Sequence, residues 1–134
     1  MNRDVRQQVA ERAGFLCEYC RTPNAFSTDD FAVEHILPRV IGGTDELNNL
    51  AWSCQGCNSR KFTATTGMAS VTGETVPLFH PRTDEWQDHF CWNDAGTQLV
   101  GLTSTGRATI ERMQLNRTDA INIRRALIAL GEHP

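Results

Sequence analysis

The alternation of apolar and polar positions in the first half of the chain predicts a helix, two short strands and a second helix. Residues 3–13 place their apolar side chains at helical spacing and are followed by the stop signal Gly14. Residues 31–36 (FAVEHI) and 49–53 (NLAWS) are short apolar runs bounded by turn residues, as is typical of paired strands. The second helix is expected directly after them, over residues 55–61.

The second half of the chain predicts a loop, a hairpin and two further helices. Residues 62–78 are rich in threonine and glycine and have little periodicity, so a loop is expected. Residues 90–103 contain two short apolar runs around a turn-rich link, which predicts the hairpin. Apolar residues return at helical spacing over residues 104–115 and 118–130. The expected caps of these helices are Ser104 or Thr105 for the first and Thr118 with Asp119 for the second.

These elements predict an α+β fold in two parts. Residues 1–66 are expected to form a small core, and residues 67–134 a C-terminal subdomain that packs on it. Apolar residues make up 40% and charged residues 22% of the chain, which is an ordinary globular balance. The N-terminus lacks a signal-peptide pattern and no apolar run is long enough to span a bilayer. A cytoplasmic protein without membrane contact is therefore expected.

Four of the five cysteines form two Cys-x-x-Cys pairs, a spacing that is typical of zinc ligands. The expected ligands are Cys17, Cys20, Cys54 and Cys57. Disulfides are disfavoured in the cytosol, and so small a core stabilises a fold by only about 3–5 kcal/mol. Structural zinc contributes on the order of 10–16 kcal/mol of apparent binding energy in small modules. The sequence therefore predicts a structural zinc site with four cysteine ligands, with unliganded thiols or a redox sensor as the weaker alternatives.

The segment EHILPRVIGGTDELNNLAWSCQGCNSRK (residues 34–61) combines three further motifs. They are an acidic residue followed by histidine on the first expected strand, Asn-Leu entering the second, and Cys-x-x-Cys-Asn-x-x-Lys opening the helix. In this combination the segment resembles the HNH endonuclease family, in its four-cysteine zinc-containing branch. The resemblance implies a small ββα-metal core (a His-Me finger) stapled by the zinc site, with the N-terminal helix and the C-terminal hairpin and helices added to it. It continues into PLFHPRTDEWQDHFCW and GLTSTGRATIERMQLNR, which are similar to the tail of a bacterial subfamily.

Hydrolysis of a phosphodiester needs a base for the attacking water and a cation for the phosphoryl oxygens, and this segment offers both. The imidazole of His35 is suited to act as general base near neutral pH. The side-chain oxygens of Glu34 and Asn58 are suited to hold one Mg²⁺ or Mn²⁺. The resemblance further implies that Asn49 ties down a loop and orients His35. It also implies that Glu34 and His35, although adjacent on a strand, both reach the cleft from a kinked strand end.

Arginine supplies twelve of the 13 basic side chains, while the formal net charge is −3. Arginine is suited to bidentate phosphate contacts, although a negative net charge disfavours non-specific binding to nucleic acid. Phosphate contacts are expected from Arg39, Arg60 and Lys61, with a solvated helix face as the open alternative. The expected partner is nucleic acid, first of all double-stranded DNA, and a homodimer is one way to cut both strands. The sequence predicts no role for His80, His89 or the C-terminal arginines.

Two functions fit this pattern. The leading expectation is a metal-dependent DNA endonuclease, and the alternative is a zinc-stabilised nucleic-acid-binding module that does not cut. A binding relic is expected to have lost Glu34, His35 or Asn58, and their joint presence favours the enzyme. Cys17→Ser or Cys54→Ser is expected to unfold the core, and Glu34→Ala to leave it folded but inactive.

Overall fold

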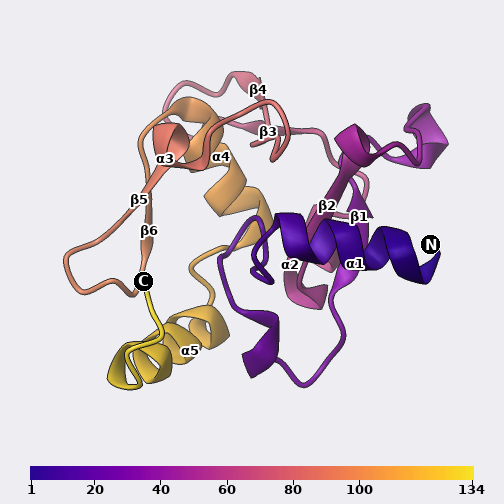
Figure 1. The fold of residues 1–134 in the computed structure, drawn as a ribbon. Helices are drawn as coiled ribbons and strands as arrows, with labels where there is room; N and C mark the ends of the chain where they lie inside the picture. Colours follow the sequence, from indigo (N-terminus) through magenta and orange to yellow (C-terminus); the bar gives the residue numbers. More distant parts are fainter. The chain divides into compact units, whose positions relative to one another are not determined.

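Residues 1–134 are all described by the computed structural model, which divides into two units (Figure 1). The first unit comprises Met1–Thr65 together with His80–Thr83, and the second comprises Thr66–Phe79 with Asp84–Pro134. Both contain helices and two-stranded sheets, so the fold is α+β, as the sequence predicts. The chain returns to the first unit at His80–Thr83, which a division at residue 66 does not include. None of the helices combines the length and the apolar character that a membrane span requires.

A two-stranded antiparallel sheet organises the first unit. Strand β1 (Ala32–His35) pairs with β2 (Leu50–Ser53) in a register that sets Glu34 opposite Ala51. All four residues of β2 are buried. Helix α2 (Gln55–Lys61) begins two residues after β2 ends, so strand, strand and helix follow one another in the predicted order.

Helix α1 (Arg3–Arg12) packs against β2. Two arginines on its polar side bind the backbone of the hairpin. A guanidinium nitrogen of Arg6 donates to the carbonyl of Phe31 at 2.9 Å, and one of Arg12 donates to the carbonyl of Leu50 at 2.6 Å. These arginines therefore attach α1 to the sheet, which restricts their availability to a ligand.

The connection between β1 and β2 contains the 3₁₀ turns Arg39–Ile41 and Leu47–Asn49, and a third 3₁₀ turn, Asn24–Phe26, precedes β1. The connection turns tightly at Gly43, whose N–H donates to the carbonyl of Pro38 at 2.9 Å. A Cβ at Gly43 would clash with the backbone carbonyl of Leu37, so only glycine fits this turn. The core of this unit includes the fully buried side chains of Val9, Cys17, Tyr19, Cys20, Leu50 and Lys61.

The second unit contains two hairpins and three helices. Its elements are β3 (Thr66–Met68), β4 (Thr75–Pro77), α3 (Trp86–His89), β5 (Phe90–Trp92), β6 (Leu99–Gly101), α4 (Ser104–Met113) and α5 (Thr118–Ala129). Each hairpin is antiparallel, and β5 pairs with β6 as predicted. The two C-terminal helices also correspond to the predicted ones.

The β3–β4 hairpin corrects the expectation of a loop over residues 62–78. Gly67 pairs with Val76, and each strand is only three residues long. A Cβ at Gly67 would lie 3.0 Å from Leu78 and 3.4 Å from Ala108, so the glycine lets this hairpin approach α4 closely. The strands escaped detection because threonine and glycine give no clear apolar alternation, although β-branched residues do favour strands.

The helix caps of the second unit differ slightly from those expected. Thr103, one residue before the expected caps, accepts the N–H of Gly106 at 2.9 Å and begins α4. Arg117 precedes α5 and makes no side-chain cap. On α5, Arg124 is fully buried and donates to the carbonyl of Leu115 at 2.7 Å, so this arginine belongs to the core.

The two histidines without an assigned role make structural contacts. Nδ1 of His80 accepts the backbone N–H groups of Arg82 and Thr83 at 3.2 and 3.3 Å. Nδ1 of His89 lies 2.6 Å from the hydroxyl of Thr103, at the start of α4.

Candidate active site and metal centre

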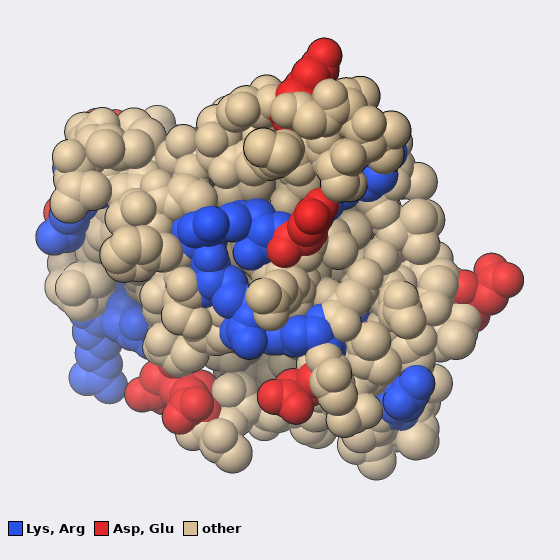
Figure 2. Space-filling view, turned by 180° about the vertical axis from the view of Figure 1, so that it is seen from behind, with Lys and Arg blue, Asp and Glu red and all other residues tan.

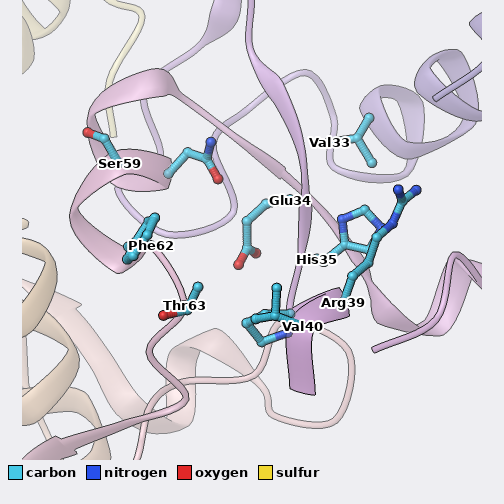
Figure 3. A pocket seen from close by; sticks show the side chains of 10 residues that line it. Val33, Glu34, His35, Arg39, Val40, Ser59, Phe62 and Thr63 are labelled. Carbon is cyan, nitrogen blue, oxygen red and sulfur yellow. The ribbon is translucent and has the colours of Figure 1, made fainter. Parts of the chain in front are cut away.

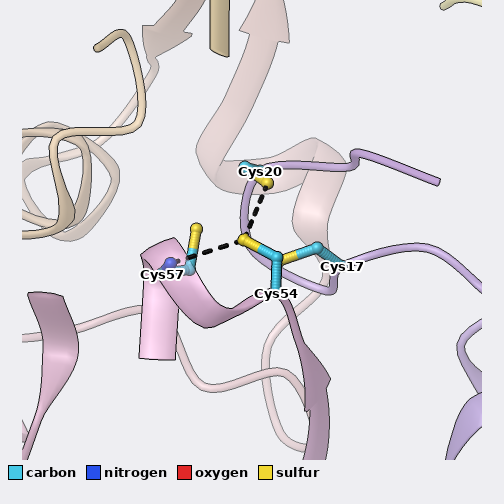
Figure 4. Close-up of side chains that lie close together, drawn as sticks. All are labelled: Cys17, Cys20, Cys54 and Cys57. Carbon is cyan, nitrogen blue, oxygen red and sulfur yellow. Dashed lines mark hydrogen bonds between the residues drawn. The ribbon is translucent and has the colours of Figure 1, made fainter. Parts of the chain in front are cut away.

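The four cysteines of the two Cys-x-x-Cys pairs come together in the first unit (Figure 4). Their sulfur atoms all lie within 4.8 Å of one another, and all four residues are buried. The sulfurs of Cys20 and Cys54 are 3.7 Å apart. Four sulfurs arranged tetrahedrally at about 2.3 Å from a zinc ion are separated by about 3.8 Å. The cluster therefore fits a metal ion such as zinc, and its four protein ligands leave no open position for water.

Local backbone geometry builds each half of the cluster. In the first pair, the N–H of Arg21 donates to the carbonyl of Cys17 at 3.0 Å, and Arg21 takes a positive φ of 67° that closes the turn. In the second pair, Cys54 caps α2, and its sulfur accepts the N–H of Cys57 at 3.4 Å. Sulfur ligands at the start of a helix receive backbone N–H groups, which stabilise thiolates.

The pKa values of these buried thiols are shifted in different directions. Burial raises the pKa of the Cys17 thiol, whereas hydrogen bonds from the neighbouring thiols lower the pKa of Cys20. A bound cation would favour the thiolate form of all four.

Glu18, inside the first Cys-x-x-Cys, connects the cluster to two other parts of the first unit. Its Oε2 accepts the backbone N–H of Trp52 at 2.8 Å, and its Oε1 forms an ion pair with Arg82. Burial lowers the pKa of the Arg82 guanidinium to about 10, which leaves it charged at neutral pH. Sequence reasoning missed this pair, because 64 residues separate its members.

A pocket of about 380 Å³ lies where β1, α2 and the turn after β1 meet (Figure 3). Three of its lining residues are Glu34, His35 and Asn58, so the structure brings the expected trio to one cavity. Figure 3 shows Glu34 pointing to one side of β1, while His35 lies with Arg39 on the other. The two side chains thus reach the cavity from opposite sides of the strand, as alternation along a strand requires.

The carboxylate of Glu34 is buried, with 4% of the residue exposed, and each of its oxygens has a partner. Oε2 accepts the hydroxyl of Tyr19 at 2.7 Å, and Oε1 lies 2.5 Å from the ammonium of Lys61. Burial and the charge of Glu34 raise the pKa of Tyr19, which keeps its hydroxyl a donor. Since a carboxylate oxygen carries two lone pairs, these two contacts leave part of the acceptor capacity of Glu34 unused.

Lys61 does not lie where a phosphate-binding residue is expected. The residue is 1% exposed, and its ammonium also donates to the carbonyl of Ile36 at 2.9 Å. A fully buried ammonium between a carboxylate and a carbonyl cannot contact a phosphate at the surface. The structure therefore does not support the expected phosphate contact of Lys61, whose ammonium is paired with Glu34 instead.

The imidazole of His35 forms part of a small charged cluster at the pocket edge. Its Nε2 lies 2.7 Å from Oδ1 of Asp45 and 3.2 Å from Nε of Arg39. Arg39 and Asp45 are themselves paired at 2.6 Å. The hydrogen bond from His35 lowers the pKa of Asp45, so the carboxylate is charged at neutral pH. Asp45 was not predicted, because the sequence of the Gly-Gly turn before it does not indicate that the loop folds back onto His35.

Asn49 lies outside the pocket and holds the loop that carries Arg39 and Asp45. Its side-chain oxygen accepts the N–H of Leu37 at 2.8 Å, and its amide donates to the carbonyls of Leu37 and Thr44 at 3.0 and 2.8 Å. Its backbone carbonyl also accepts the N–H of Ile36, the residue after His35, at 2.9 Å, so Asn49 holds both the loop and the end of the strand.

The remaining expected phosphate contacts differ in exposure. The side chain of Arg39 is exposed, whereas Arg60 is half-buried and donates to the carbonyl of Gly56 at 3.1 Å. Figure 2 shows that basic and acidic side chains both reach the surface. This mixed charge agrees with the net charge of −3.

A comparison with protein-family models matches residues 17–63 to the family described as HNH endonuclease. The matched segment runs from the first cysteine to the end of the pocket lining, and it includes all four buried cysteines. The cysteine cluster fits the zinc-containing branch of that family. No curated protein and no solved structure shows significant similarity to the chain.

Proposed function

We propose that this protein, whose residues 17–63 match the HNH endonuclease family, is a metal-dependent endonuclease that hydrolyses phosphodiester bonds in DNA. The observation that carries the proposal is the meeting of Glu34, His35 and Asn58 in one cavity of the first unit. A carboxylate, an imidazole and an amide are groups suited to such a hydrolysis.

In this proposal His35 is the general base and accepts a proton from the attacking water. Asp45 and Arg39 orient its imidazole from the loop, and Asn49 holds that loop in place. Glu34 and Asn58 would hold one Mg²⁺ or Mn²⁺ through their side-chain oxygens. When bound, such an ion supplies Lewis-acid stabilisation of the charge that develops on the phosphoryl and leaving oxygens.

The partner that we propose is double-stranded DNA. Arg39 is the exposed cation at the pocket edge that is suited to a phosphate contact, and Arg60 on α2 is a second candidate. One domain provides one cutting centre, so cleavage of both strands would take two copies of the chain or two visits.

Nicking of supercoiled plasmid with Mg²⁺ or Mn²⁺ tests the proposal. We expect the wild type to nick and His35→Ala to be slower by about 10²–10⁴-fold, the usual contribution of a positioned base. Glu46→Ala is the matched control, since Glu46 is exposed in the same loop and lies outside the pocket lining. The zinc content and circular dichroism of both variants should match those of the wild type.

Two results would contradict the proposal in different ways. Equal rates for the wild type and His35→Ala would refute the assignment of the base. Binding of DNA without nicking by the wild type, with either ion, would favour the alternative of a zinc-stabilised binding module.

A further inference from the structure

The pocket has an apolar side that the hydrolytic groups do not use. Its members are Phe62, at the end of α2, and Val40, in the turn after β1. Figure 3 shows them on two sides of Glu34. We propose that Phe62, supported by Val40, stacks against an unpaired base next to the scissile phosphate. The preferred substrate is then DNA whose bases are unstacked at the cleavage site. This inference rests on the proposed function, because it places the phosphate in the same pocket.

Exposure is the first observation behind this inference. Phe62 is 73% exposed and Val40 is 79% exposed, and Ile41 beside Val40 is 56% exposed. Large apolar side chains that cluster at the mouth of a polar cavity are typical of a binding surface. In this protein Phe62 and Val40 line the same pocket as the trio that is proposed to act on the phosphodiester.

The backbone of Phe62 is the second, independent observation. Phe62 has φ 51° and ψ −115°, in the left-handed half of backbone space that residues with a Cβ rarely adopt. Its N–H still donates to the carbonyl of Asn58 at 3.0 Å, so this residue ends α2 and turns the chain. Because the ring is largely exposed, packing within the protein does not account for a phenylalanine here. Unfavourable backbone conformations of this kind cluster at functional sites.

The chemistry of the neighbours favours a nucleobase as the occupant. A base is a flat aromatic ring joined through a sugar to a phosphate, and the pocket lining includes both an aromatic ring, that of Phe62, and an exposed guanidinium, that of Arg39. In a fully paired duplex the faces of the bases are covered by their neighbours. An unpaired nucleotide in a bubble, gap or flap leaves a face open for stacking.

The test compares two labelled DNAs of the same sequence, one fully paired and one with a central bubble. Binding is measured by fluorescence anisotropy with Ca²⁺, and cleavage with Mg²⁺ or Mn²⁺. We expect the wild type to prefer the bubble, and Phe62→Ala to weaken bubble binding by about 5- to 100-fold, the usual contribution of one stacked base. Its binding to the paired duplex should change by less than about 2-fold, because no base is stacked there.

Two control variants separate stacking from loss of structure. Phe62→Trp keeps an aromatic ring and should retain the preference for the bubble. Phe26→Ala removes another exposed aromatic ring, 41% exposed, which lies outside the pocket lining, and should leave both affinities unchanged. Zinc content verifies that each variant is folded.

The outcomes distinguish this inference from the proposed function. If the wild type cuts neither DNA while Phe62→Ala still selectively loses the bubble, stacking stands and the nuclease proposal fails. If the wild type cuts both DNAs equally and Phe62→Ala behaves like it, the nuclease stands and stacking is overturned. An equal loss on both DNAs also overturns it, because the effect would not depend on an unpaired base.

Discussion

Removing the charge of Lys61 should destabilise the first unit strongly. In Lys61→Met the aliphatic stem is largely kept, but the ammonium 2.5 Å from Glu34 is lost. Both side chains are almost completely buried, so Glu34 would remain as a buried carboxylate with only the hydroxyl of Tyr19 as partner. Breaking a buried ion pair from one side typically costs about 3–5 kcal/mol. We expect a melting temperature lower by about 12–40 °C for a unit of this size, at about 4–8 °C per kcal/mol.

The double variant Glu34→Gln/Lys61→Met isolates the cause. It contains no buried charge at this position, so its destabilisation should be clearly smaller than that of Lys61→Met alone. Thermal and urea unfolding of the zinc-loaded wild type, Lys61→Met and the double variant measure the three free energies of unfolding. If the double variant is as unstable as Lys61→Met, or more so, the loss comes from packing and the electrostatic explanation is refuted.

Three further predictions concern the metal cluster, the loop and the end of α2. Cys54→Ser should lose zinc and unfold the first unit, because it removes one of the four ligands, whereas serine can still cap α2; full zinc content by metal analysis would contradict this. Gly43→Ala should displace the loop that orients His35, so nicking should fall by about 10-fold or more while zinc stays bound; unchanged activity would show that the loop tolerates a Cβ. Phe62→Gly should raise the unfolding free energy by about 1 kcal/mol, since glycine adopts this backbone freely and little burial is lost; a loss of stability in urea unfolding would contradict this.

Local motifs account for the parts of the fold that the sequence predicted well. The two Cys-x-x-Cys pairs require their sulfurs to converge on one metal, and the short apolar runs between them require a hairpin. The cysteine cluster and the β1–β2–α2 order are confirmed for this reason. The spacing of residues within a motif is enough to predict the cysteine cluster and the order of the elements, because neither prediction needs knowledge of other contacts between distant residues.

Contacts between distant residues could not be predicted. The burial of Lys61 depends on how α2 lies against β1, and a lysine after an arginine at the end of a helix is usually solvated. The contact of Asp45 with His35 depends on a loop closed by Asn49. For the same reason nothing in the sequence indicated that Glu34→Ala, expected to stay folded but inactive, would also lose stability by leaving the ammonium of Lys61 buried without its carboxylate.

The ion pair between Glu18 and Arg82 has a consequence for any attempt to transplant this domain. A segment limited to residues 17–63, which the family model matches, would contain Glu18 without its ion-pair partner Arg82. This buried carboxylate, between the two cysteines of the first Cys-x-x-Cys pair in the sequence, would keep the N–H of Trp52 but lose its ion pair. A functional graft must therefore include the distant segment His80–Thr83, and chimaeras that exchange only the contiguous motif will inherit a weakened metal centre.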